Sequence, residues 1–174
     1  MDEPENAAPQ NDATGEPLAN GADTAPSVGV ISQYVKDFSF ENPNAPAIYQ
    51  VQGQPQFDVQ FNIGSAEVAQ DVHEVVLKID VRAETEGQVA FVVDLAYAGL
   101  FAVRNIPAEH LQPFLLGEAP RLLFPFARRV LADAVRDGGF PPLMLEPIDF
   151  NGLYYQQLEE RAAAGGQAGE LGQA

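Results

Sequence analysis

Segments with strand periodicity come first in this chain and segments with helix periodicity follow, and this order is what most constrains the fold. Apolar and polar residues alternate over residues 57–63, 72–83 and 88–103. A period of two residues is typical of strands with one buried face. Strands grouped ahead of helices favour an α+β architecture over a parallel sheet with crossover helices. The sequence therefore predicts an antiparallel sheet with helices packed on one face.

A further strand is predicted at residues 30–40, which makes the sheet four-stranded. Tyr34, Phe38 and Phe40 share one parity there, although Lys36 interrupts it, and two prolines end the pattern. A short link at residues 84–87 joins the last two strands and favours an antiparallel hairpin.

Three helices are predicted after the strands, at residues 107–116, 120–137 and 151–160. The middle one is the longest, and Gly138 and Gly139 provide its stop. One face of this helix carries an apolar stripe, made of Leu123, Ala127, Val130, Leu131 and Ala134.

The two ends of the chain differ in composition from its middle. Residues 1–27 are rich in Pro, Ala, Asn, Gly and acids, with little to bury, so we predict a disordered acidic extension. A flexible tail is predicted at residues 161–174 for the same reason. The folded domain is then residues 28–160, a common domain size.

Charge and cysteine content narrow the classes of partner. The formal net charge is −16, from 25 acidic and 9 basic side chains. Such a chain repels phosphate backbones, so nucleic acid is a poor partner and a basic protein a better one. The sequence has no cysteine, which fits a reducing compartment. It shows neither a secretory signal nor an apolar run long enough for membrane insertion, so we expect a soluble, cytoplasmic protein.

No motif for catalysis, metal binding or cofactor binding is found. The two histidines, His73 and His110, have no nucleophile or second ligand at a useful spacing. Neither a nucleophile elbow nor a phosphate-binding loop occurs. Among 25 acids, a carboxylate pair carries no information. We therefore predict a binding protein without catalytic residues, metal or cofactor.

The last two predicted strands carry apolar residues on both parities, including Val76, Ala90, Val92 and Ala96. One helical layer cannot cover both faces of a sheet. Association of identical copies is the economical solution, so we predict a homo-oligomer.

Four ordered segments resemble the SecB protein-export chaperone family. They are KDFSFENPNAP at residues 36–46, DVHEVVL at 71–77, LFPFAR at 123–128 and GFPPLMLEPIDF at 139–150. The resemblance implies a homotetramer built as a dimer of dimers. It also implies an ATP-independent chaperone that keeps precursor proteins unfolded and delivers them to the SecA translocation ATPase.

The resemblance assigns SecA binding to Asp37, Glu41, Val92 and Asp94 on an acidic outer sheet face. Parity agrees, because Asp37 and Glu41 point away from Phe38 and Phe40 on a regular strand. The alternative for these acids is simple solvation of an exposed face.

Client binding is assigned by the resemblance to apolar grooves at Phe57, Val59 and Phe61, with Tyr154 and Leu158 of the last helix as a movable wall. The alternative for the strand residues is an ordinary core role.

Two other functions remain open at this point. One is a SecB-like chaperone dedicated to a single partner protein rather than to general export. The other is an enzyme whose site is assembled across subunits from carboxylates with His73 or His110.

Overall fold

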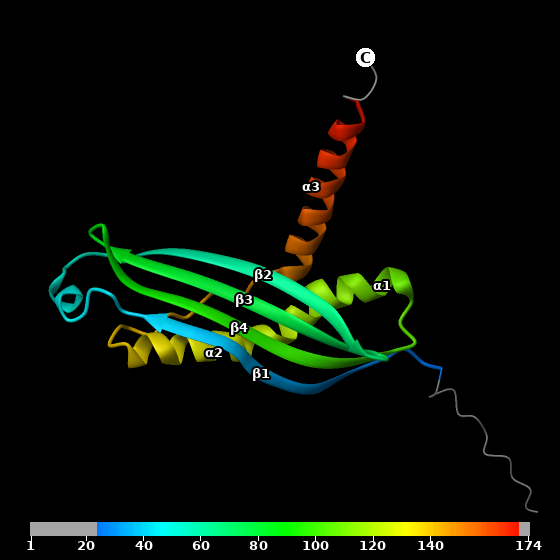
Figure 1. Ribbon diagram of the computed structural model, residues 1–174, viewed down its shortest axis with the longest axis horizontal. Helices are drawn as coiled ribbons and strands as arrows, with labels where there is room; N and C mark the ends of the chain where they lie inside the picture. Colours follow the sequence, from blue (N-terminus) through cyan, green and yellow to red (C-terminus); the bar gives the residue numbers. More distant parts are fainter. Residues whose placement is uncertain (1–23, 171–174) are drawn as a thin grey trace, which may run out of the picture.

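The alternating segments form four strands of one antiparallel sheet, in the order β1-β4-β3-β2 (Figure 1). The computed structural model describes residues 24–170. The strands are β1 (Ser27–Glu41), β2 (Gln56–Ala69), β3 (Val72–Thr85) and β4 (Gln88–Arg104). The predicted four-stranded antiparallel sheet with a packed helix is confirmed.

Two tight turns join the last three strands. Asp71 and Glu86 both have positive φ, at 59° and 50°, and Gly87 follows at 75°. Positive φ in two-residue loops matches the twist of the flanking strands. The crossing from β1 to β2 is longer: residues 42–55 pass the end of the sheet and contain a short 3-10 helix, η2 (Ala47–Gln50). Because of this longer crossing, β1 and β2 lie at opposite edges of the sheet, and β1 pairs with β4.

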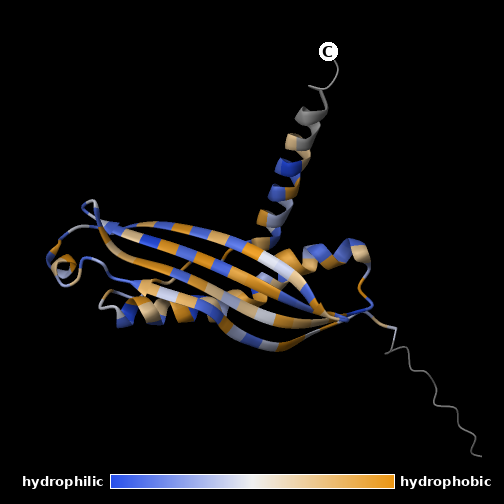
Figure 2. Cartoon of the chain, viewed as in Figure 1, coloured by the Kyte–Doolittle hydropathy of each residue, from blue (hydrophilic) through white to orange (hydrophobic). Residues whose placement is uncertain are grey.

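The longest apolar helix covers one face of the sheet. This helix, α2 (Ala119–Asp137), buries Leu123, Ala127, Leu131 and Val135, each with no exposed surface. Their spacing of four residues puts them on one side of the helix. They lie against the fully buried side chains of β3 and β4, so we call this side of the sheet the inner face and the opposite side the outer face. Figure 2 shows the alternation of apolar and polar residues along the strands that separates the two faces.

Helix α2 continues a helical path that begins with α1 (Ala108–Pro113) and runs through a π-helical segment, η3 (Phe114–Glu118). The sequence instead predicts separate helices with a link near residues 117–119. The prolines do not interrupt the path, although Pro113 and Pro125 lie inside helices. Pro120 lies in the first turn of α2, where a missing N–H is tolerated.

A bulge in β1 changes the predicted orientation of one residue. The register with β4 shifts at Lys36, between residues 35 and 37. In a regular strand, residues separated by an even number of positions lie on the same face. An extra residue between two of them puts them on opposite faces. Tyr34 therefore lies on the outer face, opposite Phe38 and Phe40, and the prediction that the three share a face is wrong.

The last helix, α3 (Phe150–Glu170), projects away from the sheet (Figure 1). Phe150 at its start is 1% exposed and anchors it against the core. The helix continues beyond residue 160, where the sequence predicts its end, into the segment predicted as a flexible tail. The predicted acidic extension lies almost entirely outside the described residues.

Candidate binding surfaces

An apolar groove lies at one end of the inner face. It has a volume of about 500 Å³ and separates two walls that are distant in the sequence. The first wall is the loop at residues 42–55, and the second is the linker that follows α2. The residues lining this apolar groove are Ile48, Tyr49, Val51, Gly53, Pro55, Phe57, Thr85, Ala90, Phe91, Gly139, Phe140, Pro141, Pro142 and Leu143.

Aromatic side chains converge at the floor of the apolar groove. The ring of Phe91 lies 5.0 Å from Phe140, 5.9 Å from Phe40 and 6.3 Å from Phe57, measured between centroids. Phe140 in turn lies 5.4 Å from Tyr49. Such offset and tilted pairs are favourable beyond their buried area and give the floor a fixed shape.

The end of α2 places the second wall. The amide of Gly138 donates to Ala134 at 2.9 Å and that of Phe140 donates to Val135 at 3.2 Å. Gly139 has a φ of +86°, the left-handed conformation that commonly ends a helix. This turn brings Phe140 back over the sheet.

A second, smaller hollow of about 40 Å³ lies between β2, η3 and α3. Phe61 at its edge is 6.1 Å from the ring of Phe150 and 6.4 Å from that of Phe124. The residues lining this second hollow are Phe61, Ile63, Leu116, Leu153, Tyr154 and Gln157.

The structure divides the predicted client-binding residues between these two spaces. Phe57 lines the apolar groove, whereas Phe61 and Tyr154 meet in the second hollow. Val59 lies between them on the inner face of β2 and packs against the core. Leu158 is 41% exposed on α3 and lines neither space.

Sequence reasoning missed Tyr49 and Phe140 as parts of the apolar groove. Both lie in segments without helix or strand periodicity, so no pattern of spacing marks them. The only signal was composition, because each is an aromatic residue in a loop rich in proline.

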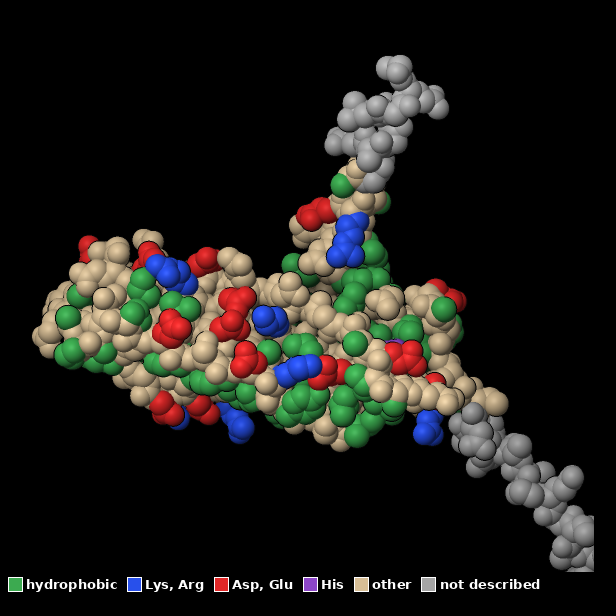
Figure 3. All heavy atoms as spheres, in the orientation of Figure 1, with side chains coloured by type: hydrophobic (Ala, Val, Ile, Leu, Met, Phe, Trp, Pro, Cys, Tyr) green, Lys and Arg blue, Asp and Glu red, His purple; other side chains and the backbone are tan. Residues whose placement is uncertain are grey.

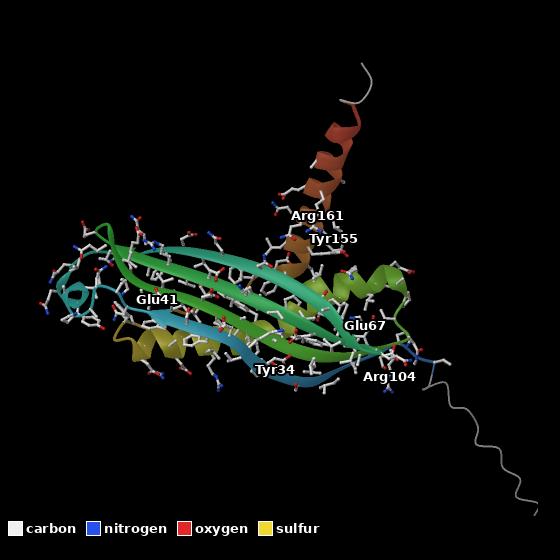
Figure 4. All side chains as sticks on the ribbon, in the orientation of Figure 1. Tyr34, Glu41, Glu67, Arg104, Tyr155 and Arg161 are labelled. Carbon is white, nitrogen blue, oxygen red and sulfur yellow. The ribbon has the colours of Figure 1, made fainter. Side chains whose placement is uncertain are left out.

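The structure brings the four predicted SecA-binding residues together at one corner of the outer face. Glu41 pairs with Val92. Asp94 occupies the next outer position of β4, opposite Ser39, and Asp37 the outer position after that on β1, opposite Ala96. Glu41 is labelled on β1 in Figure 4. The bulge at Lys36 precedes this corner, so the parity predicted for these acids holds.

A shallow hollow of about 330 Å³ adjoins this corner. Asp80 faces Asp94 across β3 and β4 in direct register. One carboxylate oxygen of Asp94, Oδ1, is buried and has no hydrogen-bond partner among the described residues. Burial and the neighbouring Asp94 charge raise the pKa of the Asp80 carboxyl. The outer side chains lining the hollow are Asp58, Gln60, Asp80, Arg82, Val92 and Asp94.

The rest of the outer face is of mixed charge. Acidic and basic side chains lie over the strands in the space-filling view (Figure 3). Glu74 accepts hydrogen bonds from Lys36 at 2.6 Å and from Tyr34 at 2.5 Å. These bonds lower the pKa of Glu74, while the bond to Glu74 raises the pKa of Tyr34 to about 12.

Neither surface carries the features of a metal centre. Within residues 24–170, no group of three or more His, Asp and Glu side chains could hold a metal ion. In the same part of the chain, no helix is long and apolar enough to cross a membrane.

The fold and its surfaces define a class of protein: a small α+β binding protein with an aromatic groove on one side and a charged sheet face on the other. The chain belongs to the SecB family, because the family model described as preprotein translocase subunit SecB matches residues 21–161. The resemblance seen in the sequence is thus confirmed. This family comprises protein-export chaperones and is not known to be enzymatic, which agrees with the prediction of a binding protein.

Relatives from bacteria cover most of the chain. The protein-export protein SecB of Sphingopyxis alaskensis is 64% identical over 151 residues, 87% of each chain. That of Zymomonas mobilis is 62% identical over 145 residues, 82% of this chain and 88% of the relative.

One solved structure shares the fold. It is the SecB-like chaperone of Mycobacterium tuberculosis, in complex with a ChAD peptide from the HigA1 antitoxin. Its TM-score is 0.59 at 18% identity, over 70% of this chain and 90% of that one.

Proposed function

We propose that this protein is a cytoplasmic chaperone that holds precursor proteins unfolded, without ATP, and delivers them to SecA. The observation that carries the proposal is the apolar groove, which leaves aromatic and aliphatic side chains open to a ligand. Membership of the SecB family supports a role in protein export.

Unfolded precursor segments suit the apolar groove physically. Apolar burial contributes roughly 25 cal/mol per Å² and has no directional requirement, so many client sequences can be accepted. The inner face of β2, with Phe57, Val59 and Phe61, connects the apolar groove to the second hollow. Weak contacts along one extended client would then add through effective concentration. The peptide complex of the Mycobacterium tuberculosis relative supports binding of this kind by the fold.

SecA docking is proposed at the acidic corner of the outer face, formed by Asp37, Glu41, Val92 and Asp94. Exposed ion pairs contribute about 0–1 kcal/mol each, so docking of a basic segment must be cumulative and sensitive to salt. Client and motor would occupy opposite faces of one sheet, which permits both to be bound together.

A homotetramer, arranged as a dimer of dimers, is proposed as the working form. In the single chain, the edge strand β1 and helix α2 leave apolar side chains exposed. These are Val28, Val30, Ile31, Val35 and Phe38 of β1 with Leu122 and Phe126 of α2. Exposed apolar surface of this kind commonly marks an interface between copies.

A refolding experiment tests the holdase role. A slow-folding precursor diluted from denaturant should refold more slowly when the protein is present in excess, because its apolar segments are occupied. Phe140→Ser should weaken this effect, whereas Val68→Ser, which truncates an exposed apolar residue outside the apolar groove, should not. Refolding at an unchanged rate with the wild-type protein would exclude the holdase role.

Charge reversal tests the docking corner. Asp37→Lys with Glu41→Lys should reduce SecA affinity and its salt dependence while leaving client capture intact. The control pair, Glu67→Lys with Glu109→Lys, reverses two exposed acids elsewhere. Equal loss of SecA and client binding in the first pair would indicate misfolding instead of a docking site.

The two rival functions are not favoured. Relatives more than 60% identical are protein-export proteins, which points to export rather than to one dedicated partner. An enzyme assembled across subunits has no support in a family that is not known to be enzymatic.

A further inference from the structure

A short hydrogen-bonded chain connects the two walls of the apolar groove. Asn42 donates from Nδ2 to the hydroxyl oxygen of Tyr49 at 2.6 Å, and that hydroxyl donates to the carbonyl oxygen of Gly138 at 2.8 Å. The same Nδ2 also lies 3.4 Å from the Gly138 carbonyl. We call this arrangement the latch. It joins residues 42–55 to the linker after α2, segments that are about ninety residues apart.

Other bonds of the first wall do not reach the second. The amide of Ile48 donates to Asn44 at 2.9 Å, which fixes the loop internally, and the Asn44 side chain donates to Val89 at 2.9 Å, which ties the loop to β4. Among the described residues, the latch supplies the direct hydrogen bonds that span the two walls.

The latch adds to the anchoring of the second wall, which the amide bond from Phe140 to Val135 and the ring contact with Phe91 also hold. Gly139, with its left-handed φ, lies directly after the carbonyl that accepts the Tyr49 hydroxyl. Beyond it, Pro141 and Pro142 are exposed and donate no backbone hydrogen bond. The ring of Tyr49 contacts that of Phe140, so the ring and the hydroxyl of one residue both join the two walls.

We propose that the Tyr49 hydroxyl is a positioning group that fixes the separation of the two walls and preorganises the apolar groove for an extended apolar segment of a client. This inference rests on the proposed client-binding function. A groove that is formed before binding avoids the cost of ordering its walls during binding. A single hydrogen bond between neutral groups corresponds to an effect of about 2- to 10-fold on affinity.

Tyr49→Phe separates the latch from a purely apolar role of the ring. If Tyr49 contributes only apolar surface, the Tyr49→Phe variant, which lacks the polar hydroxyl, should bind clients as tightly as the wild-type protein or more tightly. If the hydroxyl positions the walls, the same substitution weakens client binding. The two roles therefore predict different results for the removal of one oxygen atom.

The probe is a fluorescein-labelled nine-residue peptide rich in Leu and Phe, titrated onto the native oligomer. We expect Tyr49→Phe to raise the Kd by about 2- to 10-fold. Asn42→Ala, which leaves the ring in place, should raise it in the same direction. The Kd of the double variant should be no higher than that of the weaker-binding single variant, because both changes break one network.

Tyr34→Phe is the matched control. It removes a tyrosine hydroxyl and its bond to Glu74 from the outer face, away from the apolar groove. The control should leave the peptide Kd unchanged even if it lowers the melting temperature.

Amide hydrogen exchange of the free protein gives a readout independent of the peptide. Loss of the latch should accelerate exchange at Ile48, Tyr49 and Val51, whose amides are bonded within the loop. Exchange at the centre of β3 should stay unchanged in every variant.

Unchanged or tighter peptide binding by Tyr49→Phe overturns the latch while leaving the chaperone role standing, because the wild-type protein still binds. Failure of the wild-type protein to bind the peptide would instead remove the proposed function, and the latch with it. A fall in affinity shared equally by Tyr34→Phe would show a general loss of stability and would also overturn the proposal.

Discussion

At the scale of single residues, the facing pair of Asp80 and Asp94 is the clearest electrostatic cost in the fold. The two carboxylates lie in direct register across neighbouring strands, and like charges in that arrangement are destabilising. One oxygen of Asp94 is buried without a donor among the described residues. A proton on Asp80 would supply that donor, and this hydrogen bond raises the pKa of Asp80 in addition to burial and the Asp94 charge.

Asp80→Asn should therefore stabilise the protein at pH 7. The Asp80 carboxyl has a higher pKa in the folded state than in the unfolded state. Its ionisation therefore lowers the free energy of unfolding as the pH rises from 3.8, the ordinary pKa, through the raised pKa of the folded state. We expect a gain of about 0.5–1 kcal/mol in the free energy of unfolding at pH 7, which disappears near pH 4. Urea denaturation at both pH values and at one protomer concentration measures it.

The control for this prediction is Asp58→Asn. It removes a carboxylate from the same hollow, but Asp58 faces Arg82 and not another acid. This variant should show no gain at pH 7. An Asp80→Asn gain of equal size at pH 4 and pH 7 would contradict the role of ionisation.

The same pair was invisible in the sequence, where Asp80 and Asp94 are two of 25 acids. Alternation put each on the polar side of its strand. The register that makes them neighbours depends on the turn at residues 86 and 87 and on a register shift between Ala83 and Glu84, which leaves Ala90 of β4 unpaired. The positions Asp37, Glu41 and Val92 of the outer corner could be predicted from the sequence. The family resemblance gives the positions, and the parity of the strand indicates the face on which the two acids lie.

At the scale of elements, periodicity was a good guide to strands and a weaker guide to their irregularities. The two-residue alternation of β2 and β3, that of β4 from Phe91 onward, and the glycine stop of α2 are found as predicted. The prediction that Val89 shares the parity of Phe91 is wrong, because the register of β4 with β3 shifts at Ala90. The bulge at Lys36 was not recognised, because one inserted residue leaves the composition of a strand unchanged. The joining of α1 to α2 through a π-helical segment was missed too, since prolines near helix ends resemble helix breaks.

Gly139 offers a test of how the end of α2 shapes the apolar groove. Its φ of +86° is costly for a residue with a Cβ, and a Cβ there would lie 3.2 Å from the Tyr49 ring. We expect Gly139→Ala to lower the free energy of unfolding by about 1–2 kcal/mol. Urea denaturation at one protomer concentration measures the loss.

Gly64→Ala is the matched control for this substitution. Gly64 lies in β2, has no positive φ, and a Cβ there meets nothing within 4 Å. We expect little change in stability from it. An equal loss in both variants would mean that glycine at position 139 is not required by its backbone conformation.

At the scale of the whole molecule, the single chain exposes two different kinds of apolar surface. The apolar groove is concave and flanked by loops, whereas the exposed apolar residues of β1 and α2 lie on regular elements, and regular elements pack well against their symmetry copies. The sequence predicted self-association from the apolar residues on both faces of the strands. It could not locate the interface, because which apolar residues stay exposed depends on how α2 covers the sheet.

The final prediction concerns assembly. If β1 and α2 form the interface between copies, a charge placed among their exposed apolar residues must be desolvated on association, which is unfavourable without a partner charge. Val35→Glu and Phe126→Glu, at positions 45% and 47% exposed, should each shift the native mass from four copies towards dimers or monomers. Val68→Glu makes the same kind of change at a position 53% exposed on β2, the opposite edge of the sheet, and should leave the mass unchanged. Native mass spectrometry at micromolar concentration distinguishes these results. A wild-type monomer would contradict the proposed tetramer, and loss of assembly in the Val68 variant alone would place the interface elsewhere.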